Sequence, residues 1–269
     1  MARTPVEHPI LFSAPMVKAI LEGRKTQTRR VVKPQPKLDP AGATFRYQKG
    51  SALCSYWVPN DAGIRDISRL CAEQCPYGVP GDRLWVKETF VEYPPLLPTD
   101  SHGTVHYHAD DEHDGVRPWN GQKWKPSIFM PRWASRITLE IEYVRVQRLQ
   151  EISEEDAIAE GIEPIVSMGT YRTWKNYAPG LPAHVTAIES YRTLWNSINL
   201  KPKPIEERGA DGKKHIVGYI SFPWSNEDFD VVYPGAREAG LYRGKPLTVV
   251  ANPWVWALTF KRVAGKERG

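Results

Sequence analysis

Polar and apolar residues alternate along three stretches of the chain, and this period of two predicts β-strands. In WASRITLEIEYVRVQRL, residues 133–149, the apolar positions run from Ile137 to Tyr143 in steps of two and then change phase at Val144. Such a change of phase predicts a bulge or bend near residues 142–144. The same alternation predicts a strand in GDRLWVKETF, after its opening turn, and a closing strand in PWVWALTFKR.

Three other stretches carry apolar residues at helical spacing. SAPMVKAILEG, residues 13–23, begins with a serine that suits an N-cap and ends with a glycine that suits a helix stop. ISEEDAIAEGI, residues 152–162, has the same signals, with Ser153 and Asp156 spaced as in a capping box. Residues 183–199 form the third predicted helix. Its apolar stripe is Ile188, Tyr191, Leu194, Trp195 and Ile198.

Four long segments lack a clear period and are rich in Pro, Gly and polar residues, so we predict loops there, with a small hairpin at TVHYHAD. These segments are residues 33–78, 93–127, 163–181 and 201–245. Short strands separated by long excursions, with a few short helices, favour an α+β fold built on a small β-barrel. We expect residues 1–269 to form a single domain of this kind.

The composition is typical of a globular protein, because 41% of the 269 residues are hydrophobic and 25% are charged. No window approaches the roughly 18 apolar residues of a membrane span, and the N-terminal residues do not resemble a secretory signal. Three cysteines do not make a disulfide framework, so we expect a reducing cytoplasm.

Positive charge is concentrated near the start of the chain. The net charge is +5, whereas residues 1–37 alone hold eight Lys or Arg against two Glu. GRKTQTRR, residues 23–30, is the densest part, and such a local excess is expected where a protein meets an anion. Three interpretations stay open: a solvated basic turn, a phosphate-binding segment, or a catalytic lysine beside a hydroxyl nucleophile.

Lys25 and Thr28 are the candidates for that chemistry. A threonine hydroxyl attacks only when a base takes its proton, and a lysine serves as the base only when burial or nearby cations lower its pKa. The spacing is unfavourable, because in a regular strand the two side chains would point to opposite faces. The local sequence alone therefore favours the solvated turn.

Glu160 lies at the end of the second predicted helix, just before a glycine. A carboxylate at the negative end of a helix dipole is mildly destabilised as an anion, which suits acid–base work. Glutamates at helix ends are also common on surfaces without any function, so this position is a weak signal when taken alone.

A metal site has weaker support. Cys71 and Cys75 have a C-x3-C spacing, and Cys54 precedes them. Four histidines follow in a loop-rich segment, but no second cysteine pair completes a zinc site: His102, His106, His108 and His113. We therefore favour thiols and surface histidines over structural zinc, and we expect no metal and no cofactor. Tryptophans along the chain are candidates for stacking on bases.

Three of these stretches together resemble the ASCH domains of the PUA-like superfamily, whose motif is G-x-K-x-x-[ET]-x-R. GRKTQTRR matches it through Gly23, Lys25, Thr28 and Arg30. The threonine variant is similar to bacterial N4-acetylcytidine amidohydrolases. GDRLWVKE is similar to the strand that follows the motif in that family, and EISEEDAIAEGI resembles the helix that carries its catalytic glutamate.

The resemblance implies a PUA-like β-barrel with a cleft in which Thr28 is the nucleophile, Lys25 activates it, and Glu160 carries protons and orients Lys25. A second group is assigned to substrate or nucleic-acid binding: Arg24, Arg29, Arg30 and Glu88. The matched core covers residues 10–32, 80–90, 133–162 and 252–262. Residues 33–78, 91–132 and 163–250 are then insertions that the much shorter amidohydrolases lack.

Two functions follow as hypotheses. The first is an enzyme that removes an acyl group from a modified nucleobase or nucleoside of the N4-acylcytidine type. The alternative is a non-catalytic module that binds RNA or DNA through a single strand or a flipped base, with affinity that falls steeply with salt. A zinc-stabilised scaffold ranks third. The chain also resembles ASCH-like proteins of bacteriophages and prophages, which implies a bacterial host cytoplasm but no activity.

Overall fold

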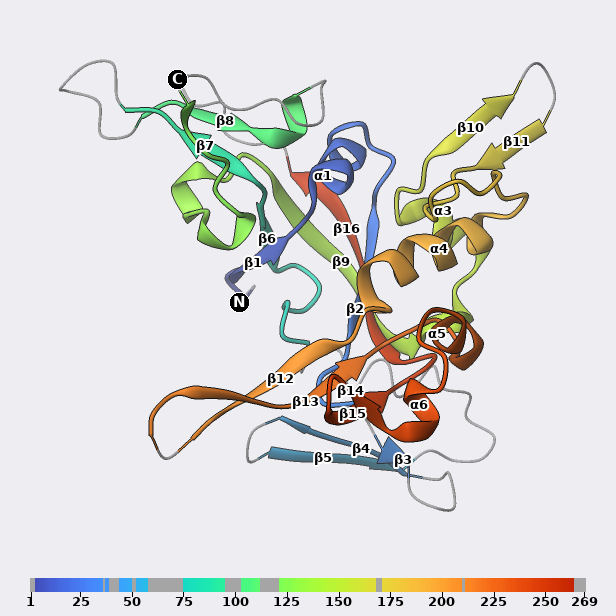
Figure 1. Cartoon of the computed structure of the whole chain (residues 1–269). Helices are drawn as coiled ribbons and strands as arrows, with labels where there is room; N and C mark the ends of the chain where they lie inside the picture. The colour runs from blue at the N-terminus through green and yellow to red at the C-terminus, as the bar shows by residue number, and fades with distance from the viewer. Residues whose placement is uncertain are drawn as a thin grey trace. The chain divides into compact units, whose positions relative to one another are not determined.

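The computed structural model shows an α+β protein with many short strands and few helices (Figure 1). It describes residues 3–35, 37–38, 44–49, 52–57, 75–94, 103–111, 121–167, 171–209 and 211–263. The chain divides into two compact units. The first comprises Met1–Thr28, Arg69–Arg145 and Leu258–Gly269, and the second comprises Arg29–Ser68 and Val146–Ala257.

A five-stranded sheet has the order β1-β6-β9-β16-β2. Its strands are β1 (Glu7–Leu11), β2 (Gln27–Val31), β6 (Arg83–Lys87), β9 (Thr138–Arg148) and β16 (Trp254–Val263). Strand β6 runs parallel to β1 and antiparallel to β9. Strands β2, β9 and β16 contribute residues to both units. The predicted strands at 81–90, 133–149 and 253–262 are therefore confirmed.

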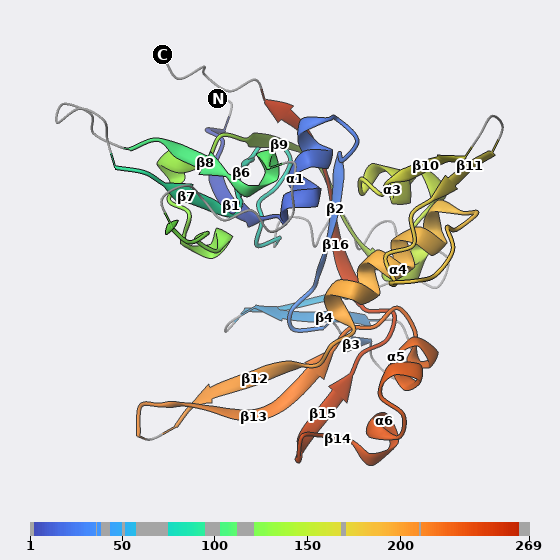
Figure 2. The same ribbon diagram turned by 45° about the horizontal axis from the view of Figure 1, so that its top comes forward.

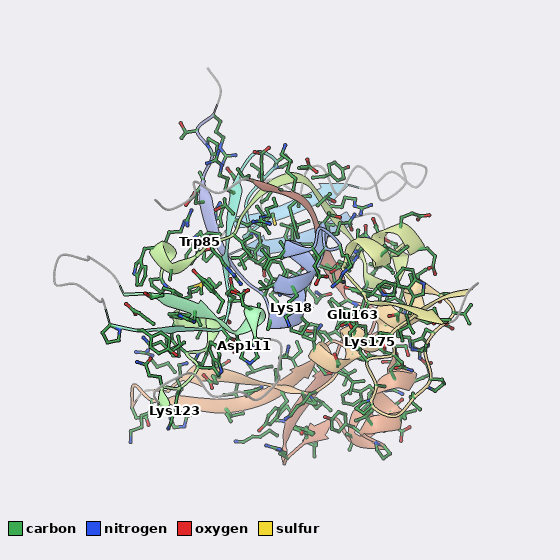
Figure 3. The ribbon with its side chains drawn as sticks, turned by 90° about the horizontal axis from the view of Figure 1, so that it is seen from above. Lys18, Trp85, Asp111, Lys123, Glu163 and Lys175 are labelled. Carbon is green, nitrogen blue, oxygen red and sulfur yellow. The ribbon has the colours of Figure 1, made fainter. Side chains whose placement is uncertain are left out.

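The first unit adds helix α1 (Ala14–Leu21) and the antiparallel pair β7 (Phe90–Glu92) and β8 (Val105–Tyr107). Short 3₁₀ helices cover 108–110, 127–129 and 132–134. Lys18 on α1 donates to the carbonyl of Asp111 at 3.2 Å, which ties this helix to the segment after β8 (Figure 3). Phe90, Met130 and Ala134 form a small buried cluster beneath these elements.

The second unit holds the remaining helices and sheets. The helices are α3 (Glu154–Ala159), α4 (Ala187–Asn199), α5 (Asn226–Val232) and α6 (Ala236–Ala239), with a 3₁₀ turn at Leu149–Glu151. The strands are β3 (Lys37–Leu38), β4 (Thr44–Lys49), β5 (Ala52–Trp57), β10 (Pro164–Ser167), β11 (Tyr171–Trp174), β12 (Lys203–Arg208), β13 (Lys214–Ser221), β14 (Leu241–Tyr242) and β15 (Lys245–Val249).

Helices α3 and α4 lie beside the β10–β11 ribbon in both views (Figure 1 and Figure 2). The ribbon is antiparallel, and an ion pair between Glu163 and Lys175, with both contacts at 2.9 Å, closes its base (Figure 3). Aromatic residues dominate the core of this unit. Its buried members are Leu149, Ile152, Ala157, Ile162, Trp174, Ala187, Tyr191, Trp195, Trp224 and Val255.

The predicted helices are found, each shorter than its sequence pattern. Ser13 is the N-cap of α1, although its side chain makes no capping hydrogen bond, and Gly23 has the positive φ of 75° expected of a helix stop. In α4 the predicted stripe is correct at Tyr191 and Trp195, which are buried, whereas Ile198 is exposed at the end of the helix.

The phase change in β9 is also observed. Leu139 and Ile141 are buried, Glu142 and Tyr143 are both exposed, and burial resumes at Val144. Tyr143 was expected on the apolar face and was misplaced, because the change of phase begins one residue before it.

Other expectations were wrong. The sheets of the described residues are open, and none of them closes into a barrel. Residues 201–245 hold strands β12, β13 and β14 and helices α5 and α6 where loops were expected. The antiparallel pair β10 and β11 lies in residues 163–181, which were also expected to be a loop, and β4 and β5 form a hairpin inside the segment expected to be irregular. Residues 105–107 pair with β7 and do not make a hairpin of their own.

Candidate functional site

The basic motif begins in a turn that closes over the end of α1. The N–H groups of Arg24 and Lys25 both donate to the carbonyl of Ala19, at 2.9 and 3.0 Å, and strand β2 starts only at Gln27. Lys25 therefore lies outside the regular strand. The objection that Lys25 and Thr28 must face opposite ways in a strand does not apply to this geometry.

Lys25 and Thr28 are both buried, with 2% and 3% of their surfaces exposed. The Lys25 ammonium lies 5.7 Å from the centre of the Phe12 ring, which is itself buried. Thr26, between them, is exposed. Interpreting this segment as a solvated basic turn was wrong, because Lys25 and Thr28 are both buried. A buried lysine is rare unless other groups compensate for its lost hydration.

The three arginines of the motif have different surroundings. Arg24 is half-buried and pairs with Glu22, with Nε donating to Oε2 at 2.7 Å. Arg30 is half-buried on β2. The Arg29 side chain is fully buried, with 0% exposed. A guanidinium in that position is not accessible to a phosphate, so its burial does not support the assignment of Arg29 to nucleic-acid binding.

Arg29 lies between two carboxylates, one from helix α3 (Asp156) and one from its C-cap residue (Glu160). Its Nη2 donates to Asp156 Oδ2 at 2.7 Å, and its Nη1 donates to Glu160 Oε1 at 3.1 Å. Asp156 and Glu160 are four residues apart, so they share one face of the helix. Burial alone would lower the pKa of Arg29, but the charges of Glu160 and Asp156 outweigh it and raise that pKa, so the guanidinium stays charged.

The sequence around α3 explains this placement. The Ser153 hydroxyl accepts the N–H of Asp156 at 3.1 Å and starts the helix, as predicted. The Asp156 carboxylate binds Arg29, so the pattern read as a capping box provides an ion-pair ligand for the neighbouring strand. Glu160 is the C-cap, followed by Gly161 with φ of 84°, and only 5% of Glu160 is exposed.

A tyrosine from α4 completes this cluster. The Tyr191 hydroxyl forms a hydrogen bond with Glu160, and the Arg29 guanidinium carbon lies 5.9 Å from the centre of the Tyr191 ring. Burial raises the pKa of Tyr191 well above its ordinary value, and the neighbouring negative charge of Glu160 adds to the effect. The phenol is therefore a proton donor to the carboxylate over the whole physiological range.

Glu160 was expected to orient Lys25. Lys25 and Thr28 are counted with the first unit and Glu160 with the second. Within its own unit Glu160 is held by Arg29 and Tyr191. The assignment of the three residues to one reaction stays a prediction.

Glu88 is at the end of the GDRLWVKE stretch, and 1% of it is exposed. Its carboxylate forms a bidentate pair with Arg136, both contacts at 3.0 Å, and Arg136 also binds Asp110 at 2.7 and 2.8 Å. Burial raises the pKa of Glu88, although Arg136 opposes this. A carboxylate held in this way supports the fold, and its geometry does not favour the substrate-binding role assigned to it.

The metal candidates do not converge in the part of the chain that the structure describes. Cys75 is a buried thiol, His106 is exposed, and His108 packs edge-on against Trp124. Cys71, His102 and His113 lie outside the described residues. Among the described residues, no group of three His, Cys, Asp or Glu side chains is arranged to hold a metal ion.

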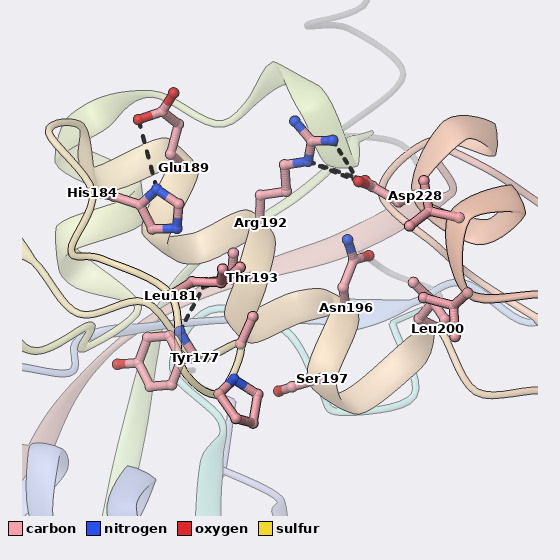
Figure 4. A pocket seen from close by; sticks show the side chains of 14 residues that line it. Tyr177, Leu181, His184, Glu189, Arg192, Thr193, Asn196, Ser197, Leu200 and Asp228 are labelled. Carbon is pink, nitrogen blue, oxygen red and sulfur yellow. Dashed lines mark hydrogen bonds and ion pairs between the residues drawn. The ribbon is translucent and has the colours of Figure 1, made fainter.

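A separate hollow of about 520 Å³ lies in the second unit between α4, α5 and residues 177–184 (Figure 4). Its polar groups bind one another: Arg192 Nε donates to Asp228 Oδ2 at 3.0 Å, and Thr193 accepts the N–H of Tyr177 at 3.1 Å. Leu181, Val231 and Val232 supply much of the apolar wall. None of the residues predicted from the sequence lines this hollow.

Two residues of the Arg29 cluster were missed. Asp156 could have been found, because two carboxylates four residues apart on a short helix form a ligand pair for a buried cation. Tyr191 had no such signal. It fits the apolar stripe of α4 as well as any core residue does, and only the fold shows that its hydroxyl meets Glu160.

Comparisons with protein-family models, curated proteins and solved structures give no match to this chain. No helix of the described residues is long and apolar enough to cross a membrane. The chain is thus an α+β protein with a buried lysine and threonine in its basic motif and a buried glutamate held by an arginine and a tyrosine. Its resemblance to ASCH domains stays a prediction.

Proposed function

We propose that this protein is an amidohydrolase that removes an acyl group from a modified nucleobase or nucleoside of the N4-acylcytidine type. The observation that carries the proposal is the burial of Lys25, Thr28 and Glu160, the three polar residues that the ASCH resemblance assigns to catalysis. Ionisable side chains are rarely buried without compensation, and functional sites are where such placement is concentrated.

The proposed reaction is acyl transfer in two steps. The Thr28 hydroxyl oxygen attacks the amide carbonyl carbon while Lys25 takes the hydroxyl proton, and the C–N bond breaks as that proton passes to the exocyclic nitrogen. The products of this step are an acyl ester on Thr28 and the free amine of the base. Water then hydrolyses the ester, Glu160 assists the proton transfers, and a carboxylic acid is released.

The alternative of a non-catalytic nucleic-acid reader has less support. It needs a row of accessible cations on the motif, whereas Arg29 is fully buried and Arg24 pairs with Glu22. A protein that only binds nucleic acid also has no need of a buried threonine and a buried lysine in the same motif. Salt-sensitive retention of oligonucleotides without turnover would favour this alternative.

The test is deacylation of N4-acylated cytidines, offered as nucleosides and within short RNA and DNA strands and followed by mass spectrometry. We expect turnover that Thr28→Ala lowers by about 10³-fold or more, as expected when a nucleophile is removed. Thr26→Ala is the matched control, because Thr26 lies in the same motif but is exposed. The absence of turnover, or equal loss in both variants, would overturn the proposal.

A further inference from the structure

Helix α4 belongs to residues 163–250, the segment that the resemblance treats as an insertion. Its N-terminus is fixed by a carboxylate from another helix. Glu154, at the start of α3, accepts the N–H of Ala187 at 2.7 Å and of Ile188 at 3.3 Å. The first N–H groups of a helix have no partner within it, and a negative charge there interacts favourably with the positive end of the helix dipole. The inserted helix is therefore anchored to α3.

The next turn of α4 is fixed as well. Ser190 donates to the carbonyl of Lys175 at 2.6 Å, and the indole N–H of Trp195 donates to the carbonyl of Phe222 at 2.8 Å. Tyr191 lies between these two residues, and its ring packs against Trp195 and Trp224 with centroids 6.3 Å away. The ring cannot change its orientation without disturbing this packing, so the direction of its hydroxyl is set by the core.

That hydroxyl meets Glu160, which Arg29 also contacts. Two donors from different elements, one on β2 and one on α4, thus restrain a carboxylate that is itself at a helix end. A catalytic carboxylate must hold its geometry closely, because a small displacement of the proton-transfer group lowers the rate by orders of magnitude.

We infer that Tyr191 is a positioning residue for Glu160, and that the inserted helix α4 therefore helps to hold this carboxylate. This inference rests on the proposed function. The inference predicts that the inserted residues 163–250 contribute to activity. Glu160 depends on Tyr191, and the shorter amidohydrolase pattern does not include that tyrosine.

A competing explanation treats Tyr191 as a core residue whose hydroxyl needs any partner. The two explanations differ in kinetics. Tyr191→Phe removes only the hydroxyl. We expect kcat to fall about 10-fold or more with KM changed less than about twofold, because in this proposal Tyr191 acts on Glu160 and not on the substrate. Tyr177→Phe is the matched control: Tyr177 lies in the same inserted segment, and its hydroxyl accepts the N–H of Glu163.

A purely structural role would lower the activity of both variants only in proportion to the loss of folded protein. Equal kcat for Tyr191→Phe and Tyr177→Phe, measured on folded protein, would therefore overturn the inference. If Tyr191→Phe fails to fold, Tyr191→Met serves for the same comparison, because a flexible methionine fills core space without a phenol.

A second measurement does not depend on activity. With ¹³C-labelled tyrosine, the ring-carbon resonance that disappears in Tyr191→Phe reports the state of this phenol. We expect it to move in Glu160→Gln, because the phenol hydroxyl then loses its charged hydrogen-bond partner. Glu163→Gln is the control and leaves it in place. An unmoved resonance in Glu160→Gln would show that Tyr191 and Glu160 do not form a hydrogen bond and would overturn the inference.

Failure of the proposed function and failure of the inference about Tyr191 give different results. A wild-type protein without turnover on any substrate, with the resonance still moving in Glu160→Gln, would remove the proposed function and leave Tyr191 as the residue that holds Glu160. Turnover in the wild type with kcat unchanged in Tyr191→Phe would keep the enzyme and remove the positioning role.

Discussion

Each unit contains an arginine held between two carboxylates beside a tyrosine ring, and the two arrangements differ in their access to water. In the second unit, Arg29 is fully buried, and Tyr191 donates its hydroxyl to one of the carboxylates. In the first unit, 25% of Arg136 is exposed, and its guanidinium lies 3.9 Å from the centre of the Tyr107 ring.

The two tyrosines are used differently. The Tyr107 hydroxyl donates to the carbonyl of Ala134 at 2.9 Å, which fixes the ring beside Arg136. Tyr191 binds the carboxylate directly. The first cluster therefore secures the fold, whereas the second also sets the geometry of one acidic group. The following predictions test that difference, beginning with the largest effect on stability.

Arg29→Met should be the most destabilising of these changes. It leaves Asp156 and Glu160 without their buried cation, and the loss of one partner from a buried ion pair costs about 3–5 kcal/mol. Urea unfolding followed by tryptophan fluorescence would measure the decrease in the free energy of unfolding. A decrease below about 1 kcal/mol would show that water reaches this cluster as easily as it reaches a surface pair.

Arg136→Met should cost less, about 1–3 kcal/mol in the same measurement. Asp110 is exposed and is hydrated when its partner is lost, and Glu88 can take up a proton because burial raises its pKa. Equal destabilisation by Arg136→Met and Arg29→Met would contradict the difference between the two clusters.

Glu88→Gln should change how stability depends on pH. Burial raises the pKa of Glu88 above its ordinary value of 4.5, so the folded protein binds this proton more tightly than the unfolded chain does. Glu88 therefore lowers the free energy of unfolding as the pH rises from about 4.5 to its folded pKa, by roughly 1.4 kcal/mol for each pH unit in that interval. We expect the Gln variant to lack this decrease, so that its free energy of unfolding falls less, or rises more, than that of the wild type over this range.

Other carboxylates give the opposite slope, which is why the wild type must be compared directly with this variant. Burial acts to raise the pKa of Asp82, but the N–H groups of Val6 and Val79 and the side chain of Arg3 outweigh it and lower that pKa. Its contribution is present at neutral pH and is lost as the pH falls. An unchanged profile in Glu88→Gln would show that Glu88 is not the group responsible.

The sequence was informative where one face of an element is buried. The phase change in β9 was predicted because burial of one face gives a periodic pattern of apolar residues. The short helix between Ser153 and Gly161 was predicted because its ends carry typical capping residues. Strand β12 was missed for the converse reason. Five of its six residues are exposed, so neither face imposes an alternation of polar and apolar residues.

The candidate site was predicted only as far as its local signals reach. Glu160 was found from a helix end, and Lys25 and Thr28 were found from a motif. The partners of Glu160 come from distant parts of the chain: Arg29 is 131 residues away, and Tyr191 belongs to another helix. Pairing over such separations is decided by the fold, and a single sequence does not record it.

The position of β16 has a consequence for how the chain acquires its structure. This strand, near residue 260, lies between β9 and β2, with Phe260 donating to Thr26 and Val32 donating to Trp254. During synthesis, β2 emerges more than 200 residues before β16, and the two strands can pair only after β16 has been made. Closing so long a loop is entropically costly, so assembly of this sheet should be a late and slow step of folding.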